Sequence, residues 1–207
     1  MRYRRQEVRF SFSGRLTLEK LSFSVKMCYN VRSAAKEADM EFSLKKWEIE
    51  MAESTAVSAN DVRIARYLRD SFPYPYSKKD AEEFIRFAQA ENARGEFYRA
   101  IAVNGKTVGG IAITRGTDVY RKSGELGYWL SPDYWNRGVM TAAVRSICEE
   151  ISESTDIIRI YAEPFSVNAA SCRVLEKCGF LKEGVKKRSV YKNGAFYDSV
   201  LYALVKN

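Results

Sequence analysis

The sequence contains no histidine. This absence excludes Ser–His–Asp and Cys–His nucleophile pairs, as well as zinc sites that depend on imidazole ligands. Acid–base chemistry must therefore come from carboxylates, tyrosine, lysine, cysteine or water. We expect no metal site.

Long apolar runs and cysteine motifs are also missing. No stretch reaches the 18 or more apolar residues that a membrane span needs. No apolar block follows the basic start MRYRRQEVRF, so a signal peptide is not expected. The four cysteines, at positions 28, 148, 172 and 178, form no CxxC pair and are too few for a disulfide scaffold. These features predict a cytoplasmic protein without membrane association.

Length and charge suggest one domain with a short appendage. A chain of 207 residues, 46% hydrophobic and 29% charged, is typical of a globular protein. The net charge of +8 is uneven, because residues 1–39 carry +5 and residues 40–207 only +3. We predict a basic extension over residues 1–39, either a small hairpin or a tail arising from an upstream start codon. The domain proper would span residues 40–207, whose mild charge does not suggest nucleic-acid binding.

The domain is patterned as an alternation of strands and helices. Two Asn-Gly pairs, at 104–105 and 193–194, predict tight hairpin turns. FSLKKWEIE (42–50) predicts a strand, and SANDVRIARYLRD (58–70) a helix capped near Ser58 or Asn60. SFPYPY (71–76) cannot be helical because of its two prolines. A hairpin of two strands is expected over 97–116, and further strands at 125–130, 157–165, 180–191 and 195–205. Further helices are expected at 78–92, 139–151 and 168–178. This order predicts a mixed α/β sheet with a central strand–helix–strand unit.

The segment YWNRGVMTAAVRSICEEI (134–151) allows two interpretations on its own. It follows a predicted strand, and its apolar residues recur at helical spacing after Gly138. A helix N-terminus at this point would expose unpaired N–H groups to an anion, and glycine would allow close approach. The alternative is a core helix preceded by an incidental glycine.

Several motifs resemble the GNAT superfamily of acyl-CoA-dependent N-acyltransferases, in its RimJ/RimL-type branch. Trp135-Asn136-Arg137-Gly138-Val139-Met140 is in the register of the family's pyrophosphate loop, and Thr141 follows it as it often does in this branch. Asn168-Ala-Ala-Ser171 and VLEKCGF (174–180) are similar to the branch's Asn-x-x-Ser … Val-x-Glu-Lys-x-Gly-Phe helix. The ending YKNGAFYDSVLYALV resembles its closing hairpin, and the resemblance covers roughly residues 42–207.

The resemblance implies a GNAT fold, a mostly antiparallel sheet with a central splayed parallel strand pair flanked by helices. Acetyl-CoA would be the co-substrate, and a small amine or a protein N-terminal α-amine the acceptor. There are two rival functions. One is a sensor or scaffold that binds acyl-CoA without turnover, and the other is a nucleic-acid-associated factor that uses the basic extension. A homodimer is left open. The cofactor-binding residues implied are Trp129, Leu130, Arg137, Gly138, Val139, Met140, Thr141, Asn168 and Ser171.

The catalytic residues implied are Glu125 as the base and Ser171 beside the thioester sulfur. Each has a plainer interpretation: Glu125 as a solvated charge at a strand end, Ser171 as a helix-packing residue and Asn168 as a helix cap. The sequence also departs from the family pattern. Leu175 stands where many members have a tyrosine that serves as the general acid for the leaving thiolate. Val190 stands where some have a glutamate, and Met140 where a small residue is usual.

The remaining candidates lie around the presumed acceptor. Phe72, Tyr74 and Tyr76 in SFPYPY would form a substrate wall or a hydrophobic lid. Cys172 and Cys178 are expected to be buried small apolar residues on different faces of their helix.

Overall fold

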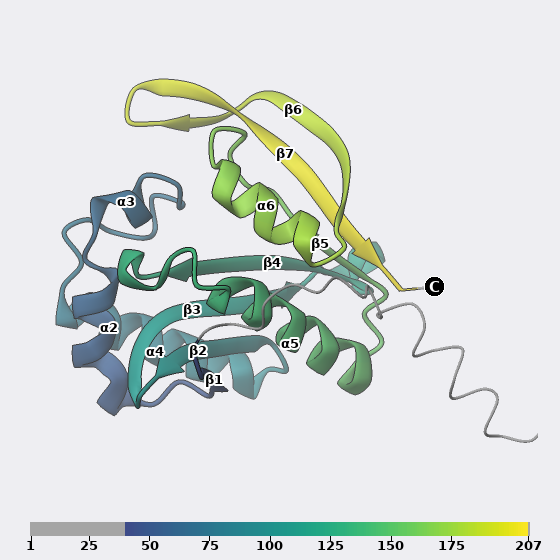
Figure 1. The fold of residues 1–207 in the computed structure, drawn as a ribbon. Helices are drawn as coiled ribbons and strands as arrows, with labels where there is room; N and C mark the ends of the chain where they lie inside the picture. The colour runs from purple at the N-terminus through teal and green to yellow at the C-terminus, as the bar shows by residue number, and fades with distance from the viewer. Residues whose placement is uncertain (1–39, 207) are drawn as a thin grey trace, which may run out of the picture. The chain divides into compact units, whose positions relative to one another are not determined.

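The computed structural model describes residues 40–206, so the predicted extension over residues 1–39 lies outside the described residues. Among the described residues, no helix is both long and apolar enough to cross a membrane. Figure 1 shows the arrangement of the elements. The strands are β1 (Ser43–Lys45), β2 (Phe97–Val103), β3 (Lys106–Arg115), β4 (Ser123–Leu130), β5 (Arg159–Ala162), β6 (Leu181–Lys192) and β7 (Ala195–Val205). The α-helices are α2 (Ala52–Ala59), α3 (Val62–Ala65), α4 (Lys78–Ala93), α5 (Val139–Ser154) and α6 (Ala169–Lys177).

The seven strands form one sheet in the order β1-β2-β3-β4-β5-β7-β6. Every neighbouring pair is antiparallel except β4 and β5, which are parallel and joined through α5. The predicted mixed sheet with a central parallel pair is therefore confirmed. Both Asn-Gly turns are present: Asn104 and Asn193 have φ of 49° and 50°, and the glycines after them 76° and 78°. Positive φ at both central residues matches the right-handed twist of the flanking strands.

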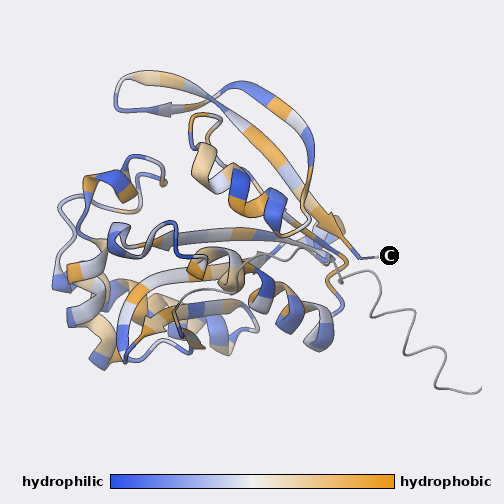
Figure 2. Cartoon of the chain, in the orientation of Figure 1, coloured by the Kyte–Doolittle hydropathy of each residue, from blue (hydrophilic) through white to orange (hydrophobic). Residues whose placement is uncertain are grey.

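Helices cover both faces of the sheet and create two apolar cores. The apolar side of α5 packs on alternate residues of β2, β3 and β4, including Ile101, Ile111 and Leu126. The other face of the sheet is covered by α2 and α4, whose core includes Ile85 and Trp47. Hydrophobic and hydrophilic residues alternate along α5 and α6, as expected for helices with one buried side (Figure 2).

The region before α4 differs from the prediction. The first strand has only three residues, and it is followed by a helix that was not predicted, α2, which begins at Ala52. The helix predicted over residues 58–70 is only the short α3, and its cap is Asp61, one residue after Asn60; the Asp61 side chain accepts from the Arg63 N–H. The error has a physical cause, because the buried side of α2 consists of the small residues Ala52, Thr55, Ala56 and Ala59. Such a stripe packs closely but produces little hydrophobic periodicity.

The C-terminal hairpin forms one edge of the sheet and extends from β5 over α6 towards α3 (Figure 1). Its outer strand, β6, has twelve residues, most of them exposed. The pairing with β7 is interrupted between Lys182 and Gly184 and again between Lys186 and Val190. Each interruption adds residues to one strand and bends it.

Candidate active site

The centre of the sheet opens between β4 and β5. Their parallel pairing covers only Ser123–Glu125 and Arg159–Tyr161, whereas β4 continues to Leu130. Beyond Glu125 the two strands therefore separate. Two cavities, of about 780 and 560 Å³, meet at this opening. They share six lining residues: Tyr67, Leu68, Tyr128, Trp129, Asn168 and Ser171.

The smaller cavity, here called the helix-side pocket, is built around the N-terminus of α5. Gly138 is the N-cap residue, with φ of 78° and no side-chain cap. The first N–H to bond within the helix is that of Ala142, which donates to the Gly138 carbonyl at 3.0 Å. The N–H groups just before it, on Val139, Met140 and Thr141, have no carbonyl of their own helix to bond. They line the pocket and fit an anion such as a pyrophosphate.

The large side chain of Met140 is compatible with such a cradle. Met140 is only 8% exposed, and it packs in the core under α5 together with Val139. Its size is therefore accommodated within the protein, and the departure from a small residue does not obstruct the N–H groups.

The charge of the helix-side pocket also suits phosphate groups. Its lining contains four basic residues and no acid: Arg63, Arg66, Arg173 and Lys177. Arg137 is absent from this lining, and its guanidinium carbon lies 5.9 Å from the centre of the Tyr134 ring. Any contribution of Arg137 to an anion site would come from its backbone.

Asn168 and Ser171 lie at the start of α6, where the two pockets meet. The side-chain oxygen of Asn168 accepts a hydrogen bond from the Ser171 N–H at 3.2 Å, so Asn168 caps the helix. The Ser171 hydroxyl lies 2.8 Å from the Tyr128 hydroxyl, which also donates to the Ser171 carbonyl at 3.3 Å. The capping role and a ligand role are compatible, because Asn168 also lines both pockets.

Tyr128 is a site residue that the sequence reasoning missed. It alternates with Leu126 and Leu130 on the side of β4 that packs towards α5. A tyrosine on a buried strand face needs a partner for its hydroxyl, and that requirement was the available signal. Burial raises the pKa of Tyr128, so the phenol stays protonated throughout the neutral range.

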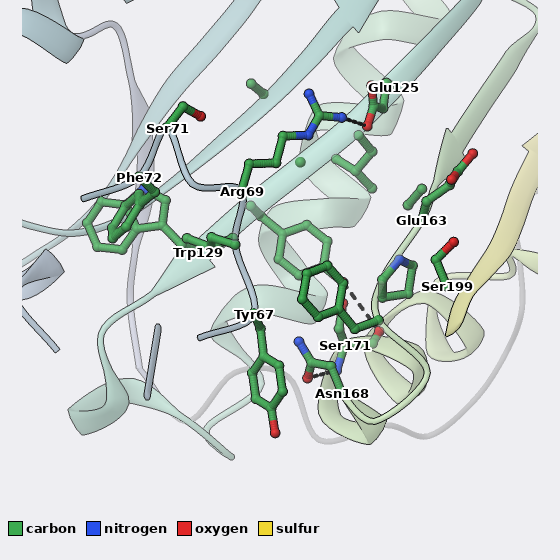
Figure 3. A pocket seen from close by; sticks show the side chains of 18 of the residues that line it. Tyr67, Arg69, Ser71, Phe72, Glu125, Trp129, Glu163, Asn168, Ser171 and Ser199 are labelled. Atoms are coloured by element: carbon green, nitrogen blue, oxygen red, sulfur yellow. Dashed lines mark hydrogen bonds and ion pairs between the residues drawn. The ribbon is translucent and has the colours of Figure 1, made fainter. Parts of the chain in front are cut away.

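The larger cavity, here called the aromatic pocket, lies on the other side of the opening. Nine of its lining residues are aromatic: Tyr67, Phe72, Tyr76, Phe84, Tyr98, Tyr128, Trp129, Phe165 and Tyr191. Phe72 lies 4.8 Å from Tyr76 and 5.9 Å from Trp129, measured between ring centres. Figure 3 shows Phe72 and Trp129 together on one side of this pocket, away from Asn168 and Ser171. Tyr74, predicted as part of the same wall, is 53% exposed and lines neither pocket.

The charged residues of the aromatic pocket are all paired. Glu125 lies at the last position where β4 pairs with β5, and it forms an ion pair with Arg69 (Figure 3). The other two pairs are Lys186 with Glu163, and Lys192 with Asp70. Three acids and three bases therefore balance within the lining.

Lys192 joins the tip of the β6–β7 hairpin to the loop that lines the aromatic pocket. Its side chain is only 9% exposed, and its ammonium group donates to the Leu68 carbonyl at 2.7 Å and to Asp70 at 2.9 Å. The tip of the C-terminal hairpin is thereby attached to the loop that carries Arg69 and Phe72.

The cysteines of the described residues show no sign of an activated thiol. Burial raises the pKa of the Cys172 thiol, and it raises that of Cys178 to about 11. Both are half-buried, whereas Cys148 is fully buried. Within residues 40–206, no group of three or more Cys, Asp or Glu side chains is placed to hold a metal ion.

A mixed sheet that opens between two parallel strands, with an uncapped helix N-terminus at the opening, is the arrangement expected of an acyl-CoA-dependent acyltransferase. The chain belongs to the GNAT acetyltransferase family, since residues 42–181 match the acetyltransferase (GNAT) domain. The predicted resemblance is thus confirmed.

Individual relatives agree with this family. The uncharacterized N-acetyltransferase YoaA of Bacillus subtilis is 37% identical over 82 residues, which are 40% of this chain and 46% of that protein. The alignment thus spans about half of that relative. The acetyltransferase MccE, solved with acetyl-CoA and AMP, superposes with a TM-score of 0.73 at 23% identity, covering 81% of this chain and 94% of its own. RimL, a ribosomal L7/L12 α-N-protein acetyltransferase solved with coenzyme A, gives 0.73 at 19% identity over 82% and 96%. Both structures have the same fold as this chain.

Proposed function

We propose that this protein is an acetyl-CoA-dependent N-acetyltransferase that acts on a primary amine, with an α-amine preferred. The observation that carries the proposal is the meeting of two dissimilar pockets at the opening between β4 and β5. One is basic and built on a helix N-terminus, and the other is aromatic with a carboxylate beside the opening. A phosphate-bearing acyl donor and an amine acceptor would meet between them.

The helix-side pocket would hold acetyl-CoA. Backbone N–H groups of residues 137–141 would bind the pyrophosphate, with the basic lining around them. Trp129, Leu130 and Asn168 would flank the pantetheine arm as it enters the opening. Acetyl-CoA supplies the activated acetyl group, and the chain's residues orient it and exclude water.

The transfer would be direct. The lone pair of a neutral amine attacks the thioester carbonyl, an amide bond forms, the carbon–sulfur bond breaks and the thiolate leaves. No histidine is present, and the two cysteines nearest the site have raised pKa values, so a thiolate carrier at neutral pH is disfavoured. An acyl-enzyme would require such a nucleophile.

Glu125 would accept the proton of the attacking amine, directly or through water. Deprotonating a lysine-type amine with a pKa of about 10.4 costs about 4.6 kcal/mol at pH 7, against about 1.4 kcal/mol for an α-amine with a pKa near 8. A single carboxylate already paired with Arg69 is adequate for the smaller cost. The α-amino acceptor named for RimL agrees with this preference.

Ser171 and Tyr128 would act on the leaving sulfur. Ser171 lies at the junction of the pockets, and its hydroxyl is hydrogen-bonded to a phenol that stays protonated. The two hydroxyls would thus stabilise the departing thiolate by hydrogen bonding, and the thiolate would take its final proton from solvent. The free thiols of the described residues are consistent with a cytoplasmic location, which is part of the proposal.

Thermal unfolding and turnover test this function together. A ligand that binds only the native state stabilises it by about 2.7 kcal/mol at a hundredfold excess over its Kd. Acetyl-CoA should therefore raise the melting temperature and be consumed in the presence of amines. Gly138→Glu should abolish both effects by placing a carboxylate at the helix N-terminus. Gly105→Glu is the matched control, because Gly105 has φ of 76° and open space around it in the β2–β3 turn. An unchanged melting curve at millimolar acetyl-CoA would contradict the proposal.

A further inference from the structure

The floor of the aromatic pocket has an unusual lack of side chains. Glu125, Gly127 and Trp129 lie on one face of β4, since side chains alternate along a strand. Gly110 and Ala112 of β3 are paired with Trp129 and Gly127. Between Glu125 and Trp129, therefore, no side chain on this floor is larger than a methyl group. We call this feature the Gly127 slot, with Ala112 and Gly127 as its floor.

The slot is open above Gly127. Gly127 is exposed, and a Cβ atom added to it would meet no other atom within 4 Å. Gly110 differs, because a Cβ there would lie 2.7 Å from Nε1 of Trp129. Gly110 thus lets the indole lie close against β3, whereas Gly127 leaves free space between the carboxylate and the indole. The Cα atoms of Glu125 and Trp129 are roughly 13 Å apart, because they are separated by four residues of one strand, and the free space lies within that span.

The walls of the slot are aromatic and its charges are balanced. Trp129 and Phe72 close one end, and the pairs described above neutralise all three acids of the pocket. No excess charge remains to hold a second charged group, which disfavours polyamines and acidic acceptors. A ring on this floor could contact peptide planes below it and approach the indole in the offset or edge-on geometry that aromatic pairs prefer.

We propose that the Gly127 slot binds a flat aromatic group adjoining the acceptor amine. The acceptor is then an α-amine next to an aromatic side chain, either in a small molecule or at the start of a peptide. The amine points to Glu125 and the ring lies towards Trp129. This inference rests on the proposed function and deepens it by naming the substrate class.

Steady-state kinetics of the full chain with four acceptors test the slot. The probes are phenylalaninamide, alaninamide, and two tetrapeptide amides that begin with Phe or Ala and are otherwise identical. We expect kcat/KM to be at least tenfold higher for the phenylalanine member of at least one pair, and the pair with the larger ratio identifies the source of the acceptor. Equal values within both pairs, or a preference for alanine, would overturn the inference while leaving the proposed function standing.

A steric variant separates the slot from the rest of the site. Gly127→Val fills space above the floor, and the Cβ that it adds meets no other atom within 4 Å. It should lower kcat/KM at least tenfold for the phenylalanine acceptor but less than threefold for alaninamide. The Kd of acetyl-CoA should change less than twofold. Gly184→Val is the matched control, because Gly184 is also a strand glycine with open space and lines neither pocket. An equal loss with both acceptors would contradict an aromatic subsite.

Binding distinguishes failure of the slot from failure of the proposed function. Should acetyl-CoA bind but no amine be acetylated, the proposed function is wrong. Calorimetric titration of phenylalaninamide into the protein with coenzyme A then tests the slot alone. Binding that Gly127→Val weakens at least tenfold supports the inference, and the absence of binding to the unaltered chain overturns it.

Discussion

The phenol oxygen of Tyr128 lies 2.8 Å from Oγ of Ser171, and this contact joins β4 to α6 across the opening of the sheet. The two hydroxyls belong to residues that line both pockets. They are therefore placed where the helix-side pocket and the aromatic pocket meet, whereas Leu175 lines neither pocket.

The hydroxyl pair should affect chemistry rather than binding. We expect Ser171→Ala to lower kcat roughly tenfold, less than the ~100-fold typical of a general acid, because a thiolate leaves readily. Tyr128→Phe should lower kcat in the same direction, with the KM for acetyl-CoA little changed in both variants. Tyr120→Phe, at an exposed tyrosine outside both pockets, is the control. Unaltered kcat in both site variants would remove the pair from the mechanism.

Glu125 should matter most at low pH. Below about pH 8 an α-amine is mostly protonated and needs a base, whereas above it the neutral amine is already abundant. Glu125→Gln should therefore lower kcat most strongly below pH 8, with little change in the Kd of acetyl-CoA. Glu163→Gln is a matched comparison, because it removes a paired carboxylate from the same pocket. An identical pH profile for the two variants would argue against a special role for Glu125.

Lys192 should position the acceptor loop. Hydrogen bonds to charged groups contribute about 1.5–3 kcal/mol, so losing both contacts loosens the loop that carries Arg69 and Phe72. Lys192→Met should raise the KM for the amine roughly tenfold and leave the Kd of acetyl-CoA unchanged. Lys187→Met removes an exposed pair with Asp198 within the same hairpin and should change neither value. A KM for the amine close to that of the unaltered chain in Lys192→Arg would support a positioning role for Lys192. A rise in the Kd of acetyl-CoA in Lys192→Met would contradict that role.

Tyr76 should make stability fall at high pH. Burial raises the pKa of Tyr76 from 10.0 to about 12, with a smaller contribution from Asp80. Between these values the unfolded chain loses the proton and the folded chain keeps it, so the free energy of unfolding decreases as pH rises. The stability is fully present below pH 10 and is lost as pH approaches 12. Tyr76→Phe should therefore lose less melting temperature than the unaltered chain between pH 9 and 11; a parallel decline would show that Tyr76 does not contribute.

The predicted domain boundary can be tested by truncation. Met40, Phe42 and Leu44 pack against the core under α5, so a chain starting at Met40 retains all of these contacts. It should keep its response to acetyl-CoA in thermal unfolding and its turnover. A chain starting at Lys46 lacks β1 and should melt at a lower temperature. Insolubility of the Met40 chain would place the boundary within residues 1–39.

Local signals in the sequence were sufficient for most of the fold. The two Asn-Gly turns, the glycine before α5 and the start of α4 each depend on a few adjacent residues; α4 begins after Ser77, whose side chain accepts from the Asp80 N–H and caps the helix. These features have short-range physical causes, namely positive φ, side-chain capping and helical spacing. The helix α2 was missed, because its buried stripe of small residues differs little in hydropathy from its exposed side and so produces no clear helical spacing of apolar residues.

The candidate site was only partly predictable for a related reason. The helix-side pocket follows from one turn, whereas the aromatic pocket depends on contacts between distant segments. Glu125 meets Arg69 across 56 positions, and Lys192 meets Asp70 across 122. No local pattern encodes such pairs. Tyr74 shows the converse error, since its proximity in sequence to Phe72 and Tyr76 suggested a shared wall that the loop conformation does not create.

The bent and charged outer strand β6 has a consequence for self-association. A sheet edge with unpaired backbone groups is a template on which a second chain can add a strand and start aggregation. Here twelve residues of edge are interrupted twice, and the strand carries Lys182, Lys186, Lys187 and Arg188 among its exposed residues. The other edge, β1, is only three residues long. Both edges are thus poor templates, and the hairpin that lines the aromatic pocket also protects the sheet from edge-to-edge polymerisation.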